Sequence, residues 1–338
     1  MCAAVGAIMV RSDFAAGVPL PASRSSARQI ALHADDLGMN SAVTDGILQG
    51  FEQGLLTSTS LLSNAPDAAR ALDCWRHLES RRLQGSLASM ARRERLRDPA
   101  QPFDLGIHLN LTEGRPRIGS RYPAELLNAS GHFPGIFGLF RRLWHGDDSV
   151  TAAIKEELTS QVQFMLDLGH RPTHLNGHQY IEMLPVVDRV VKSLLEKFCI
   201  PVVRVAWEPS WWQSFTWPGI RTSQWLIGGL KKVHAGRFRQ KMLGNKVLFA
   251  DVFFGTMTAG TTSLEIIRAF LATMRDFHLA EIALHPGVRP VAAVSATDGW
   301  HDPLALMRPR ELEMLVSREL EELLAASGCR LGRLGQTP

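Results

Sequence analysis

Short apolar runs alternate with amphipathic stretches along most of this chain of 338 residues. The runs are mostly apolar on both faces, as parallel strands buried between two layers are. Between them, stretches such as 41–54, with Val43, Ile47 and Phe51 on one face, have helical periodicity. This alternation predicts an α/β fold with a parallel sheet, and closure into a (β/α) barrel is its simplest arrangement. The predicted strands are 29–34, 58–65, 103–111, 173–179, 201–207, 246–254, 281–286 and 329–334.

Composition excludes several classes of protein. The chain is 45% hydrophobic and 21% charged, which is ordinary for a globular protein, and no apolar run of about 18 residues is present to span a membrane. The four cysteines are far apart, without a CxxC pair, so we expect neither a disulfide framework nor a zinc-thiolate site. Such cysteine usage is typical of a reducing compartment, and we expect a cytoplasmic protein.

The domain organisation predicted from the sequence is simple. The start, MCAAVGAIMVRSDF, has no basic residue before its short apolar stretch and so lacks the pattern of a secretory signal; we expect 1–28 to be a disordered tail. Residues 29–335 show no internal boundary and predict a single domain. Two segments look inserted into it as loops or excursions over a site: 80–101 is rich in arginine, and 112–148 is rich in glycine and proline.

Ionisable side chains recur where the predicted strands end. Asp35 and Asp36 end the first strand, and His108 lies near the end of the third. The fourth strand is flanked at its end by two histidines, and a late strand ends in another. Because the carboxyl ends of parallel strands meet on one face of a sheet, all six side chains should converge. The histidines of the later strands are His174, His178 and His285.

Two carboxylates and several imidazoles in one place have a plausible chemical use. One carboxylate and two neutral imidazoles form a three-ligand site for a divalent cation, with a position left open for water. The second carboxylate can act as general base, and a remaining histidine can protonate a leaving group. Considered one at a time, the two aspartates could cap a turn, and His108 could be an ordinary core histidine. Their shared position at strand ends favours the metal site.

Five motifs, in this order along 29–334, extend the pattern: HADDLGMN, GLLTSTSLLSNAP, GIHLNLTEGRP, RPTHLNGHQYIEMLP and IALHPG. Together they resemble the YdjC-like carbohydrate deacetylases, a family that includes chitooligosaccharide deacetylases and the deacetylases associated with hopanoid biosynthesis. The resemblance implies a (β/α) barrel-like deacetylase fold and metal-dependent removal of acetyl from an N-acetylated sugar. It also implies a homodimer, which is frequent in the family.

The resemblance also assigns roles to individual residues. It implies one divalent metal ion, Mg²⁺ or Zn²⁺, with Asp35 as general base and His285 as proton donor to the amine. His174 would orient a metal ligand, and Arg204 would lie near the substrate. The chain departs from the family's histidine-rich run at Gln179, Tyr180 and Glu182, which leaves the metal ligands intact. Those implied ligands are Asp36, His108 and His178.

The segment 211–246 combines basic residues with tryptophans and contains no acidic residue. It is typical of a peripheral contact with an anionic membrane surface, such as the inner membrane, which would suit a lipid-linked glycan. The tryptophans could instead stack on sugar rings, or the segment could be a solvated basic helix with tryptophans facing the core. Nucleic acid is excluded as a partner because the net charge is only +4 and no nucleic-acid motif is present.

Three functions are therefore weighed. The leading hypothesis is metal-dependent N-deacetylation of an amino sugar or glycoconjugate, releasing acetate. A metal-dependent hydrolase of an ester or phosphoester is an alternative, for which arginines of 81–97 could hold phosphate. A carbohydrate-binding or membrane-binding barrel without catalysis is the third, and it predicts a broken metal site, whereas Asp36, His108 and His178 are all present.

Overall fold

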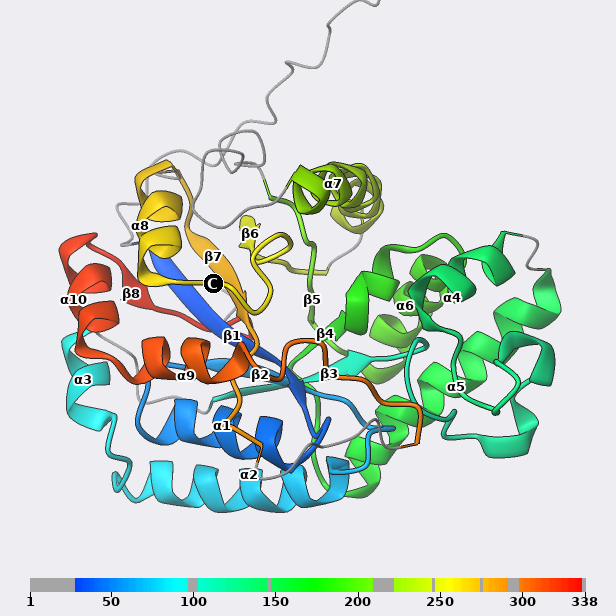
Figure 1. The fold of residues 1–338 in the computed structure, drawn as a ribbon, viewed down its shortest axis with the longest axis horizontal. Coiled ribbons are helices and arrows are strands. Elements are labelled where there is room, and N and C mark those ends of the chain that lie inside the picture. The colour runs from blue at the N-terminus through cyan, green and yellow to red at the C-terminus, as the bar shows by residue number, and fades with distance from the viewer. Residues whose placement is uncertain are drawn as a thin grey trace, which may run out of the picture.

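A single curled parallel sheet forms the centre of the molecule (Figure 1). The computed structural model describes residues 28–96, 103–144, 147–208, 222–244, 247–273, 276–290 and 298–335. Among them, seven strands follow one another in the order β5-β4-β3-β2-β1-β7-β6, and β8 pairs with β1. The strands are β1 (Gln29–Leu37), β2 (Ser58–Leu61), β3 (Asp104–Leu109), β4 (His174–Gly177), β5 (Val202–Val203), β6 (Val252–Phe254), β7 (Leu279–Leu284) and β8 (Arg330–Leu331).

The sheet curls into a half-barrel, and hydrogen bonds link the segments around its two end strands. Leu248, just before β6, accepts a hydrogen bond from the backbone N–H of Val203 at 2.9 Å, and Phe253 donates to the carbonyl of Trp207 at 3.0 Å. The barrel-like α/β fold is thus confirmed. A regular ring of eight strands is not formed in the described residues, because β8 pairs only with Gln29 and Ile30 at the start of β1.

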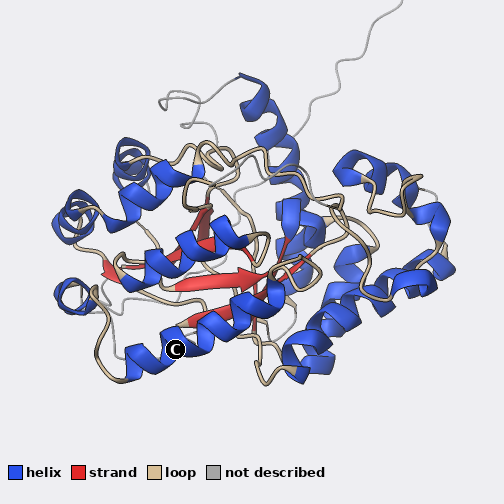
Figure 2. Cartoon of the chain, turned by 60° about the horizontal axis from the view of Figure 1, so that its bottom comes forward, coloured by secondary structure: helices blue, strands red, loops and turns tan. Residues whose placement is uncertain are grey.

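Helices alternate with the strands and surround them on the outside (Figure 2). Helix α1 begins where the side chain of Asn40 accepts the N–H of Val43, and it buries Val43, Ile47 and Phe51 as its periodicity predicts. Three short 3₁₀ helices are η1 (Gly119–Arg121), η2 (Ala124–Leu126) and η3 (His178–Met183). The α-helices are α1 (Ser41–Glu52), α2 (Ala68–Leu83), α3 (Met90–Arg95), α4 (Gly135–Leu143), α5 (Asp148–Asp167), α6 (Val187–Phe198), α7 (Thr222–Leu243), α8 (Leu264–Thr273), α9 (Arg308–Val316) and α10 (Arg318–Ala326).

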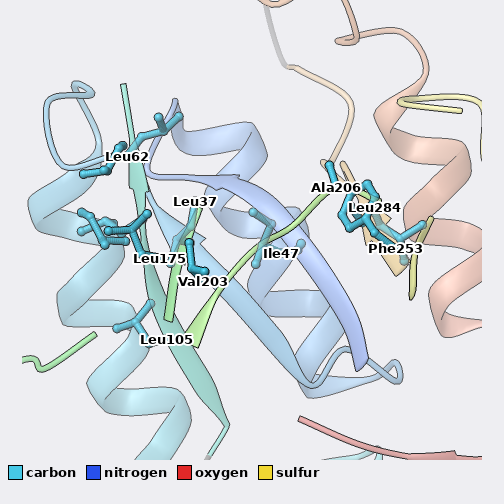
Figure 3. Close-up of a cluster of buried hydrophobic side chains, with 14 of the residues drawn as sticks. Leu37, Ile47, Leu62, Leu105, Leu175, Val203, Ala206, Phe253 and Leu284 are labelled. Carbon is cyan, nitrogen blue, oxygen red and sulfur yellow. The ribbon is translucent and has the colours of Figure 1, made fainter. Parts of the chain in front are cut away.

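The hydrophobic core lies on both faces of the sheet. Leu37, Leu105, Leu175, Phe253 and Leu284 come from five strands and are buried together (Figure 3). Their burial explains why the strand sequences are nearly continuous apolar runs. The polar residues described below are therefore exceptions, which a core of this kind tolerates only when they are paired.

The arginine-rich segment 80–101 differs from the loop expected there, since it contains the end of α2 and all of α3. Its arginines replace apolar residues in packing. Arg93 is 3% exposed, donates to the carbonyls of Gly54 and Leu56 at 3.1 and 2.7 Å, and lies 4.7 Å from the ring centre of Phe103. A search for apolar periodicity misses such a helix. The other expected insertion, 112–148, carries η1, η2 and α4.

The basic segment 211–246 lies partly outside the described residues. Trp211, Trp212 and Trp217 fall there, and so does the side chain of Trp225. The described part is mainly the backbone of α7. No helix in the described ranges is both long enough and apolar enough to cross a membrane.

Candidate metal centre

Both aspartates lie at the carboxyl end of β1 and are buried, Asp35 at 5% and Asp36 at 3% exposure. In a regular strand two successive side chains point to opposite faces. Here the pairing of β1 with β2 shifts register between Ala34 and Leu37, and Asp36 has φ of +71°. This irregularity lets both carboxylates contact residues of the same site, and a left-handed aspartate at the centre of a site is a strain that function often maintains.

Asp36, His108 and His178 form a compact group. One ligand atom from each lies within 4.8 Å of the others. The Oδ1 atom of Asp36 is 3.5 Å from Nε2 of His108 and 3.1 Å from Nδ1 of His178. The structure thus brings together the three residues expected to hold a metal, from β1, β3 and the start of η3.

The tautomer of His108 is set by Asn176 of β4. Nδ1 of His108 lies 2.8 Å from Oδ1 of Asn176, an oxygen that can only accept, so Nδ1 donates. In the neutral ring, Nε2 of His108 is then the nitrogen that is free to bind a metal, and it faces the carboxylate of Asp36. The two atoms are 3.5 Å apart, and an Asp–His–His set suits a divalent metal. The residues present fit such an ion.

The site is strongly negative around His178. Burial disfavours the charged imidazolium, but Asp36 and Glu113 outweigh that effect and raise the pKa of His178 to about 10. Nδ1 of His178 faces Asp36, and its Nε2 atom is 3.8 Å from an oxygen of Glu113. A field that holds a proton so tightly also favours a metal cation in the same place.

Arg308 of α9 holds the second oxygen of Asp36. Its Nη2 atom is 2.8 Å from Oδ2 of Asp36, and its Nε atom is 2.8 Å from Asp302. Burial alone would raise the pKa of Asp36, but Arg308, with help from His108 and His178, holds it well below the ordinary value. Asp36 is consequently ionised, with Oδ2 occupied and Oδ1 directed at the two imidazoles.

Asp35 lies in a closed network. Its Oδ2 atom is 2.7 Å from Nη1 of Arg204, and its Oδ1 atom accepts from the amide of Asn176 at 3.1 Å and lies 3.1 Å from Nε2 of His33. Burial opposes ionisation of Asp35, yet Arg204, His108 and His33 keep its pKa well below the ordinary value. The other side of Arg204 contacts Glu281 of β7 at 2.8 Å. Arg204, expected near the substrate, is thus fully buried under the predicted general base.

His285 follows β7 on the same edge of the sheet. Its Nε2 atom is 3.8 Å from Oδ2 of Asp35, and its backbone N–H donates to Glu311 at 2.5 Å. Burial lowers the pKa of His285 to about 4, although Asp36 and Asp35 act in the opposite direction. His285 is therefore neutral near pH 7, and its Nε2 atom faces Asp35 from beyond direct hydrogen-bond distance.

His174 lies deeper in the barrel than the other predicted site residues. Its Nδ1 atom is 2.9 Å from the hydroxyl of Thr173, and its ring meets that of His33 edge to face, with centres 4.9 Å apart. The ring covers Gly106, where an added Cβ would come within 2.3 Å of it. The contacts described for His174 do not include the three candidate ligands, so any orienting effect would pass through His33.

Five residues of the site were absent from the sequence prediction: His33, Glu113, Asn176, Glu281 and Arg308. His33 and Asn176 stand inside the motifs LHADD and HLNGH, and their proximity to the aspartates and histidines was a usable signal. Glu281, a charge within an apolar strand, was a weaker signal. Arg308 gives none, because it lies 272 positions from its partner Asp36.

The half-barrel and the buried acceptor cluster at its carboxyl edge define an α/β protein with a candidate hydrolytic metal centre. The chain belongs to the YdjC-like protein family, whose model matches residues 29–326. This confirms the resemblance found in its motifs.

Relatives that cover most of the chain are named carbohydrate deacetylase. The mouse protein is 27% identical over 323 residues, covering 90% of this chain and 93% of its own length. The human protein is 27% identical and covers 90% of this chain and 89% of its own length. The protein of Vibrio vulnificus strain YJ016 is 24% identical and covers 87% and 90% respectively.

A solved structure supports the fold. The crystal structure of a protein from Enterococcus faecalis V583, proposed to cleave cellobiose phosphate, has a TM-score of 0.65 and 20% sequence identity to this chain. The match covers 91% of this chain and 98% of that one. At this identity the likeness concerns the fold alone.

Proposed function

We propose that this protein hydrolyses the acetamide of an N-acetylated amino sugar or glycoconjugate and releases acetate. The observation that carries the proposal is the pair of adjacent carboxylates in two different environments. Asp36 lies with His108 and His178 in a group that could hold a metal ion, whereas Asp35 is bound by Arg204 and is not part of that group. The names of the relatives support a carbohydrate as the substrate.

Asp36, His108 and His178 would hold one divalent cation, with zinc favoured by the two imidazoles and magnesium admitted by the carboxylate. When bound, the cation would polarise the acetyl carbonyl and lower the pKa of water. Asn176 and Arg308 orient these ligands. Asn176 fixes the tautomer of His108, and Arg308 binds one oxygen of Asp36.

The remaining residues move protons. Asp35 is ionised through its contact with Arg204. It accepts a proton from the attacking water while the water oxygen bonds to the acetyl carbon. The C–N bond then breaks, and the leaving nitrogen needs that proton. His285 would carry it from Asp35 through one bridging water, since its Nε2 atom is 3.8 Å from Asp35. The products are acetate and a free amine.

The phosphoester alternative loses its main support. The arginines of 81–97 that the structure describes are used elsewhere: Arg93, for example, binds the carbonyls of Gly54 and Leu56, which precede β2 at the opposite edge of the sheet. Arg92 pairs with Glu321 at 2.9 Å. Near the aspartates, Arg204 and Arg308 are both committed to carboxylates.

Acetate release tests the proposal. The purified protein would be assayed with N,N′-diacetylchitobiose and with an N-acetylglucosaminyl lipid, each with and without EDTA. We expect acetate that EDTA abolishes and that is restored by zinc or magnesium. Asp36→Ala should abolish it, whereas the exposed control Asp73→Asn should not. The preferred substrate would distinguish a soluble oligosaccharide from a lipid-linked sugar. Metal binding without acetate from either substrate would refute deacetylation and direct attention to esters.

A further inference from the structure

Helix α4 presents an aromatic face to solvent. Phe137 is 85% exposed, Phe140 40% and Trp144, the residue that caps the helix, 71%. Spacings of three and seven residues place these three side chains on one face. The opposite face is also apolar, since Leu139 and Leu143 are buried. A helix on the surface of a globular protein normally has a polar outer face, so α4 is unusual.

These three residues are the only exposed phenylalanines and tryptophans in the part of the chain that the structure describes. The rings of Phe140 and Trp144 lie together, with centres 5.9 Å apart. Isolated exposed apolar residues are common on protein surfaces, but aromatic side chains gathered on one helix face indicate an interaction site.

A groove continues this surface from α4 to α7, which lie on the same side of the molecule (Figure 1). It consists of two cavities of about 370 and 420 Å³ that share Pro185, His234 and Arg237. Apolar side chains from several elements line it: Phe140, Leu143, Leu184 and Phe238. The groove has the apolar lining and the size to receive part of an amphiphile.

The charge around the groove is positive. Helices α4 and α7 contain no Asp or Glu, and Arg141 lies on the aromatic face of α4. The acid in the groove, Asp188, is paired with Lys241. Nearby Asp147 caps α5 by accepting the N–H groups of Ser149 and Val150, which offsets its charge.

We propose that the α4–α7 surface, made of Phe137, Phe140, Arg141, Trp144 and Arg237, docks on an anionic phospholipid bilayer. Tryptophan and phenylalanine partition into the interfacial region, and guanidinium groups meet the lipid phosphates. A second copy of the chain fits less well, because a twofold axis through this surface would set its positive charges against themselves. This proposal does not depend on the deacetylase activity.

Vesicle flotation tests the docking directly. The full-length protein would be mixed with vesicles of phosphatidylcholine containing roughly one third phosphatidylglycerol, and with vesicles of phosphatidylcholine alone. We expect flotation with the anionic vesicles only, weakened when the salt is raised from about 0.1 M to about 0.5 M. Equal binding to both vesicles, or binding to neither, would overturn the proposal.

The variant Phe137→Ser/Trp144→Ser shows whether the aromatic face is responsible. We expect its affinity for anionic vesicles to fall at least about tenfold, since each lost ring removes a large apolar area from the interface. Leu83→Ser is the matched control, because Leu83 is 74% exposed on α2, away from this surface, and it should bind as wild type. Equal loss in both variants would refute the assignment, with thermal unfolding checking that each remains folded.

The competing occupants give different results. If two copies of the chain meet through this surface, sedimentation would show a dimer that Phe137→Ser/Trp144→Ser dissociates, and wild type would not float with vesicles. If the surface takes an acidic soluble protein, the purified chain would stay monomeric and would not float. Either result contradicts membrane docking.

Discussion

The two neighbouring aspartates lie in regions built on opposite plans. Around Asp35, donors meet acceptors: Arg204 and Asn176 both donate to the carboxylate. Around Asp36, Arg308 donates to one oxygen, and the other oxygen faces the imidazoles of His108 and His178. In the first region both carboxylate oxygens are held by donors of the protein, whereas in the second one oxygen and two imidazoles form a group that could hold a metal ion. One peptide bond therefore separates the carboxylate proposed as the general base from the carboxylate proposed as a metal ligand.

The largest effect should come from neutralising each aspartate in turn. Asp36→Asn should reduce zinc affinity by at least about 100-fold, because a ligand is lost rather than a group that orients one. Asp35→Asn should bind zinc nearly as wild type but release no acetate. Calorimetric titration of zinc, alongside the acetate assay, measures both. If Asp35→Asn lost the metal as completely as Asp36→Asn, the two regions would not be separate.

Replacing the arginine of each region should lower the unfolding free energy in both cases, but only one of the two losses should be recovered by zinc. Arg204→Met leaves Asp35 and Glu281 buried without a counter-charge and should cost about 3–5 kcal/mol of unfolding free energy. Arg308→Met removes the partner of Asp36, but a bound cation can offset that loss. Urea unfolding with and without saturating zinc checks this. Zinc should recover much of the stability of Arg308→Met and little of that of Arg204→Met; equal recovery would contradict the comparison.

Asn176 joins the two regions, since its oxygen faces His108 and its amide donates to Asp35. Asn176→Ala should weaken zinc binding by about 10–100-fold, because the ring of His108 loses the group that fixes its tautomer. Asn176→Asp keeps the acceptor for His108 but places a second carboxylate beside Asp35. It should retain zinc affinity and lose stability. Comparable zinc affinities for the Ala variant and wild type would show that His108 is oriented by something else.

The sequence predicted the neighbours of Asp36 better than the neighbours of Asp35. Asp36, His108 and His178 could be foreseen because parallel strands deliver their carboxyl ends to one edge, whatever their separation in the chain. The partners of Asp35 could not be foreseen in this way. Arg204 pairs with Asp35 and Glu281 because their side chains reach one another across the barrel, and the strand order does not give that reach.

The lengths of two strands were overestimated for a related reason. The runs 201–207 and 246–254 read as whole strands, but only Val202–Val203 and Val252–Phe254 join the sheet. The residue Trp207 still meets Phe253 through a backbone hydrogen bond outside the strands. An apolar run shows that a segment is buried, and does not show where its hydrogen-bonded ladder ends. The helices within 80–101 escaped prediction because buried arginines replace the apolar stripe.

Asp104, another buried carboxylate, extends the comparison, and its expected effect is the smallest. Asp104 begins β3 and is 4% exposed, and burial raises its pKa to about 6, although the backbone N–H of Gly335 and the charge of Arg333 act against this. At Asp104 burial outweighs these effects, whereas at Asp35 and Asp36 the charges of Arg204 and Arg308 help to outweigh burial.

A raised carboxyl pKa has a definite sign for stability. The stabilising contribution of Asp104 is fully present below its unfolded pKa near 3.8 and is lost as pH rises through about 6. Asp104→Asn removes this dependence, so its stability relative to wild type should improve by about 1–3 kcal/mol between pH 4 and pH 8. Urea unfolding at both pH values measures the difference. A relative stability that stayed constant with pH would mean that burial does not raise the pKa of Asp104 and that it is ionised as readily as the two paired aspartates.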